Sequence, residues 1–134
     1  MHLLAQKYRQ AQFFAHAAHN LVKGTAFFAD HEYLGSLYTS YEEAYDALIE
    51  RMIGLDDENA DPLKVTKDAA VAAEKLLVGK SVDAFSELLD MEREICDMVR
   101  DQLKEIPSAG TANLLQGLAD ASEARQYKIS QRIS

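Results

Sequence analysis

The sequence contains no tryptophan and a single cysteine, Cys96, among its 134 residues. One cysteine excludes an intramolecular disulfide and a multi-thiolate zinc site, and it favours a reduced, cytoplasmic protein. Proline and glycine are scarce, at 2 and 6 residues, which favours long helices over many turns. No apolar run approaches the ~20 residues that a membrane-spanning helix needs. The first residues, which include Lys7 and Arg9, do not resemble a signal peptide.

The sequence also has fewer basic than acidic residues. Lys and Arg total 14 and Asp and Glu total 22, so the net charge is −8. Binding to DNA or to an anionic membrane face through bulk charge requires a basic surface. We therefore expect no membrane partner and no strong DNA binding.

The apolar residues recur at helical spacing along four long segments, and no segment shows the alternation of a strand. The spacing predicts long helices over residues 3–22, 26–53, 82–105 and 111–132, and a shorter helix over 63–77. Thr25 and Ser81 are predicted to cap the second and fourth of these five helices. With 48% hydrophobic residues, the chain is predicted to form a single all-α domain over residues 1–134. Its expected architecture is a four-helix bundle with a short extra helix in the middle connection.

Residues suited to metal binding gather on the first two predicted helices. His19 ends the first, His31 lies near the start of the second, and Asp46 and Glu50 follow four residues apart on one face of the second. Imidazoles and carboxylates are suitable ligands for iron or another divalent transition metal. An Asp and a Glu at this spacing are also common on a solvated helix face, so the pattern alone leaves both interpretations open.

Helix length constrains the metal interpretation. His31 and Asp46 are 15 residues apart, which is roughly 22 Å of helix, and Glu50 lies roughly 28 Å from His31. One helix cannot bring these groups to one metal ion. They can meet only if a second copy of the helix lies antiparallel across a two-fold axis. The spacing therefore predicts a metal site shared between subunits.

The residues between His19 and Arg51 resemble the signature of the Dps mini-ferritins, the DNA-protection-during-starvation proteins. The matching positions are His19, Gly24, Phe27, Phe28, His31, Asp46, Glu50 and Arg51, without a gap. The resemblance implies a ferritin-like fold and a homo-oligomer, a hollow dodecamer. It also implies that iron(II) is oxidised by hydrogen peroxide or O2 at the two-fold interface and that iron(III) is stored in the cavity. His19, His31, Asp46 and Glu50 would then be both the metal ligands and the catalytic residues of this ferroxidase.

One departure from the family pattern concerns the oxidant. The family usually has tryptophan directly after the first histidine, where this sequence has Asn20. Tyr38, Tyr41 and Tyr45 could replace that aromatic residue, although tyrosines at this spacing more often pack in a core. The preference for peroxide is therefore left open.

Two other functions are compatible with a helical bundle of this kind. A ferritin or other di-iron enzyme with its site inside one subunit uses Glu-x-x-His pairs, and no Glu here precedes a His by three residues. A non-catalytic helical bundle that kept the Dps fold as a structural or interaction protein remains the alternative.

Glu92 interrupts the apolar stripe of the helix predicted over 82–105. A core carboxylate needs a partner. We expect an edge position for Glu92, with Leu88 or Met91 packing inward.

Overall fold

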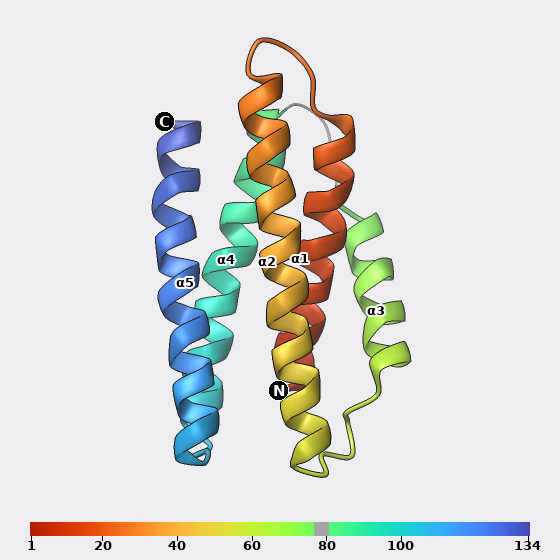
Figure 1. The fold of residues 1–134 in the computed structure, drawn as a ribbon, viewed down its shortest axis with the longest axis vertical. Coiled ribbons are helices and arrows are strands. Elements are labelled where there is room, and N and C mark those ends of the chain that lie inside the picture. The colour runs from red at the N-terminus through yellow and green to blue at the C-terminus, as the bar shows by residue number, and fades with distance from the viewer. Residues whose placement is uncertain (77–80) are drawn as a thin grey trace.

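The structure, a computed structural model, describes residues 1–76 and 81–134, and all regular secondary structure in these residues is helical (Figure 1). Five helices follow one another along the chain: α1 (His2–Leu21), α2 (Phe27–Gly54), α3 (Pro62–Glu74), α4 (Ser81–Leu103) and α5 (Ala109–Ile133). The four long helices form a bundle, and the shorter α3 packs against the outside of α1. The predicted four-helix bundle with a short extra helix is confirmed.

The topology follows from the lengths of the connections. Short loops make α1 and α2 antiparallel neighbours, and likewise α4 and α5 (Figure 1). The connection from α2 to α4 returns the chain along the length of the bundle, and α3 occupies it. As a result α2 and α4 run in the same direction, which is the arrangement of ferritin-like bundles with one long crossover.

The ends of the helices depart slightly from the sequence predictions. The N-cap of α2 is Ala26, one residue later than the predicted Thr25. Ser81 is the first described residue of α4, and the residue before it lies outside the described residues, so the capping role of Ser81 stays a prediction. Gly24 adopts φ +102°, a conformation that favours glycine, in the turn between α1 and α2. The helix α3 ends at Glu74, earlier than the predicted end at residue 77, which itself lies outside the described residues.

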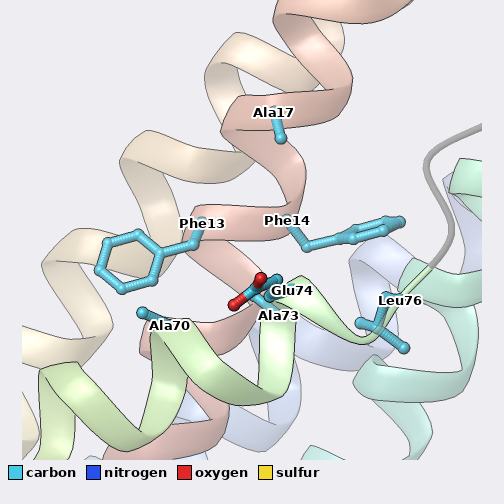
Figure 2. Close-up of a pocket in the computed structure, with 7 residues that line it drawn as sticks. All are labelled: Phe13, Phe14, Ala17, Ala70, Ala73, Glu74 and Leu76. Atoms are coloured by element: carbon cyan, nitrogen blue, oxygen red, sulfur yellow. The ribbon is translucent and has the colours of Figure 1, made fainter.

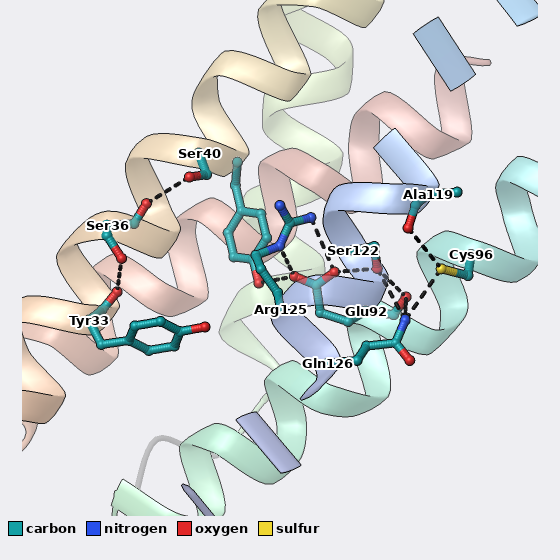
Figure 3. Close-up of polar contacts among 10 residues, drawn as sticks. Tyr33, Ser36, Ser40, Glu92, Cys96, Ala119, Ser122, Arg125 and Gln126 are labelled. Carbon is teal, nitrogen blue, oxygen red and sulfur yellow. Dashed lines mark hydrogen bonds and ion pairs between the residues drawn. The ribbon is translucent and has the colours of Figure 1, made fainter. Parts of the chain in front are cut away.

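The core contains a buried ionic network, and the expectation for Glu92 was wrong. Glu92 is fully buried, and its carboxylate accepts hydrogen bonds from three side chains (Figure 3). These are Tyr41 at 2.6 Å, Ser122 at 2.5 Å, and Arg125, whose Nε and Nη2 lie 2.5 and 3.2 Å from the two oxygens. The helical periodicity had correctly placed Glu92 within the apolar stripe of α4. The partners lie on α2 and α5, so the sequence around Glu92 could not reveal them.

None of the described helices is long and apolar enough to cross a membrane.

Candidate metal centre

His19 and His31 meet where the end of α1 packs against the start of α2. Their rings stack with centroids 3.7 Å apart. Nδ1 of His19 lies 2.6 Å from the backbone carbonyl oxygen of His31, and Nδ1 of His31 lies 2.8 Å from that of His19. Each histidine is thus fixed by the backbone of the other.

This reciprocal arrangement determines which nitrogen of each ring can bind a metal. A carbonyl oxygen only accepts hydrogen bonds, so each Nδ1 must carry the proton and donate it. In a neutral imidazole the proton on Nδ1 leaves Nε2 with a free lone pair. Metal-binding histidines commonly donate their second N–H to a backbone carbonyl or a carboxylate, which orients the ring. The structure therefore provides two oriented Nε2 donors.

Aromatic side chains surround the two imidazoles. Phe27 stacks on His31 with centroids 4.9 Å apart, and Tyr38 meets His19 edge-on at 5.4 Å. Tyr38 also stacks on the exposed His16, with centroids 4.1 Å apart. Of the three tyrosines that could replace the missing tryptophan, Tyr41 and Tyr45 are buried in the core, and the half-buried Tyr38 is the one that contacts a candidate ligand.

The two carboxylates stand apart from the histidines. Asp46 and Glu50 are exposed on α2, and neither forms an ion pair within the described part of the chain. In residues 1–76 and 81–134 no three His, Cys, Asp or Glu side chains lie close enough to hold a metal ion. The histidine pair and the carboxylate pair are therefore two separate groups of candidate ligands, as the length of α2 requires.

Two features beside the histidines were not found from the sequence. Asp30, one residue before His31, is buried and paired with Arg132 of α5. Gly35 lies against the ring of His19. Ion-pair partners 102 residues apart leave no local signal, and a glycine inside a predicted helix indicates a close contact only once the neighbouring helix is placed.

A separate groove lies between α1 and α3 (Figure 2). Its volume is about 420 Å³, and its lining includes Phe13, Phe14 and Ala70. Among the described residues of the lining, Glu74 alone is charged. The groove is therefore an apolar surface between two helices and not a second polar site.

A family model for the ferritin-like domain matches residues 3–134. The chain belongs to the ferritin-like family. A solved member of this fold, the DPS protein from Vibrio cholerae O1, superposes with a TM-score of 0.68 at 21% sequence identity. The match covers 99% of this chain and 86% of that chain, which is described as a member of a broad superfamily of ferritin-like diiron-carboxylate proteins. No curated protein matches the sequence significantly.

Membership of the ferritin-like family gives the two groups of candidate ligands a chemical context. Proteins of this fold bind iron through carboxylates and histidines on bundle helices. In the present chain His19 lies on α1, the other three candidate ligands lie on α2, and the Glu92–Arg125 network fills the centre of the bundle. Among the described residues, the candidate ligands form no metal-binding group inside a single bundle.

Proposed function

We propose that this protein is a Dps-type mini-ferritin. It binds iron(II) at a site between two subunits, oxidises it with hydrogen peroxide or O2, and stores the iron(III) in a hollow homo-oligomer, a dodecamer. The observation that carries the proposal is the reciprocal pair of His19 and His31. It leaves two oriented Nε2 donors, one at the end of α1 and one near the start of α2, and α2 also carries Asp46 and Glu50.

Each ligand has a distinct role in this proposal. The Nε2 atoms of His19 and His31 bind the incoming iron(II) as neutral donors. Asp46 and Glu50 of the partner subunit complete the site, and their negative charges favour the more highly charged iron(III) product. Their exposure on α2 leaves them free to face a second copy.

The proposed oxidation balances without a further reductant. Two iron(II) ions each give one electron to a peroxide molecule, which takes up two protons and leaves as two water molecules. The reaction removes iron(II) and peroxide together, so it protects against the damage that the two cause in combination. The single cysteine suits the reducing cytoplasm in which free iron(II) persists.

The position of the two-fold axis follows from the sequence numbers. The midpoint of His31 and Asp46 is (31 + 46)/2, which falls between Tyr38 and Thr39. In an isologous dimer with its axis across α2 at this point, residue 31 of each copy is level with residue 46 of the other. The arrangement produces two equivalent sites per dimer.

A complementation experiment tests the shared site. His31→Ala and Glu50→Gln are each expected to abolish fast iron(II) oxidation, because each variant damages both sites of its homodimer. In a mixed dimer one site carries both changes and the other carries neither. After co-refolding of equal amounts, half of the dimers are mixed and one of their two sites is intact, so about a quarter of the wild-type activity should return.

The readout is the ferric absorbance that develops after iron(II) is added to the protein. Peroxide is tested as the oxidant under anaerobic conditions, and O2 is tested under aerobic conditions. If the mixture oxidises iron(II) no faster than either single variant, the site is not shared between subunits. If the wild type itself is no faster than buffer, the protein is a non-catalytic bundle that kept the fold. Size-exclusion chromatography tests the cage separately, since a monomer or an isolated dimer would contradict it.

A further inference from the structure

Gly35 is an unusual residue for its position. It lies in the interior of α2, two turns after the start of the helix. Glycine is among the poorest helix formers because it loses the most backbone entropy when the helix forms. A glycine inside a helix therefore calls for a local reason, and in this chain the reason is the ring of His19.

The space beside Gly35 is occupied by the imidazole of His19. A Cβ atom at position 35 would lie 3.3 Å from Cε1 and 3.4 Å from Nδ1 of that ring. The ring has little room to retreat, because its Nδ1 is held by the carbonyl oxygen of His31 at 2.6 Å and its face stacks on the His31 ring. Tyr38 meets another part of the same ring edge-on.

We propose that Gly35 is a positioning residue for the metal centre. Its missing side chain lets the His19 imidazole lie directly against α2, where Nδ1 reaches the carbonyl of His31 and Nε2 remains available to a metal. A methyl group at position 35 would push the ring away by a few tenths of an ångström and lengthen the Nδ1 hydrogen bond. The inference rests on the proposed function in one respect, namely that His19 is a ligand.

The test compares Gly35→Ala with a matched control. Gly117 lies in the interior of α5, and apart from its chain neighbours and the nearby backbone of α5 no described atom comes within 4 Å of a Cβ built there. Gly117→Ala should raise the unfolding temperature by a few degrees through helix propensity alone and leave metal binding unchanged. Gly35→Ala should keep or raise the unfolding temperature, yet weaken binding of Co(II), used as the spectroscopic probe, by about tenfold.

The two readouts separate positioning from a merely structural role. If Gly35 serves only the fold, Gly35→Ala should lower the unfolding temperature, and any loss of Co(II) affinity should follow that loss of stability. A thermally intact variant whose Co(II) absorption band is weakened or shifted supports positioning. Equal Co(II) affinity and an identical band in the two alanine variants would overturn it.

A crystal structure of metal-free Gly35→Ala keeps this inference distinct from the proposed function. We expect a displaced His19 ring and a longer Nδ1 contact to the His31 carbonyl, with the His31 contact to His19 retained. If the ring is displaced but the wild type binds no metal, the positioning geometry stands and the proposed function fails. If the wild type binds metal and the ring does not move, the inference on Gly35 fails alone.

Discussion

Arg132 and Asp30 form a two-point ion pair that joins the last turn of α5 to the first turn of α2. Nε and Nη2 of the guanidinium lie 2.9 Å from the two carboxylate oxygens. Arg132 also lies over the ring of Phe85 of α4. Because His31 directly follows Asp30, the ion pair holds the helix end that carries a candidate ligand.

Arg132→Leu should lower the free energy of unfolding by roughly 2 kcal/mol, since it leaves the buried Asp30 carboxylate without its charged donor. Urea denaturation at a fixed protein concentration measures the change. Arg100→Leu is the matched control, because Arg100 forms an exposed ion pair with Asp97. This variant should lose at most a few tenths of the unfolding free energy that Arg132→Leu loses. Equal losses in the two variants would contradict a structural role for the Asp30 pair.

The same ion pair should make stability depend on pH in the acid range. The hydrogen bonds from Arg132 lower the pKa of Asp30, against the opposing effect of burial. A depressed folded-state pKa contributes stability that is complete above the unfolded value of about 4 and is lost as the pH falls through the folded value. The stability difference between wild type and Arg132→Leu should therefore be full at neutral pH and shrink below about pH 4. A difference that stays constant on acidification would contradict this coupling.

The Glu92–Arg125 pair should show strong coupling in a double-mutant cycle. Glu92→Leu or Arg125→Leu alone leaves a charge inside the bundle, at a cost of about 3 kcal/mol. The double replacement removes both charges and should recover most of that loss. Additive losses, measured by chemical denaturation, would mean that the two side chains contribute independently.

The buried hydroxyl groups of two tyrosines can be removed one at a time by substitution with phenylalanine. Tyr41 donates to Glu92, so Tyr41→Phe should cost roughly 2 kcal/mol of unfolding free energy. Tyr8 is equally buried, but its hydroxyl has no hydrogen-bond partner among residues 1–76 and 81–134. Tyr8→Phe should therefore cost much less than Tyr41→Phe, because it removes a buried hydroxyl without a hydrogen-bond partner among the described residues. A large loss in Tyr8→Phe would show that its hydroxyl is bonded in solution.

Duplex DNA should not bind tightly to this protein. With a net charge of −8 per chain, an assembly of many copies repels the phosphate backbone at long range. A gel-shift assay at low salt is the most favourable condition for binding, and we expect no retention there at submicromolar protein. Retention under those conditions would contradict the charge argument.

The sequence predicted the features that depend on local periodicity. Helical spacing placed α1 and α2 to within about one residue, and the family signature selected His19 and His31, which the structure then brought together. Features that depend on distant partners were not accessible. Glu92 was expected at an edge because its donors Tyr41 and Arg125 lie 51 and 33 residues away. The juxtaposition of these two histidines with Asp46 and Glu50 remains a prediction, since it requires a second chain.

The outlying helix α3 has a consequence for how the protein fluctuates. It packs on α1 and buries only Val65 and Ala69, whereas every other helix contributes at least four buried residues. A segment with so little buried surface can detach while the rest stays folded, at a smaller free-energy cost than global unfolding. Amide hydrogens of α3 should then exchange with solvent through this partial opening, ahead of those at the centres of α1 and α2. The protein is thus expected to comprise two cooperative units, a slow-exchanging bundle and a fast-exchanging outer helix.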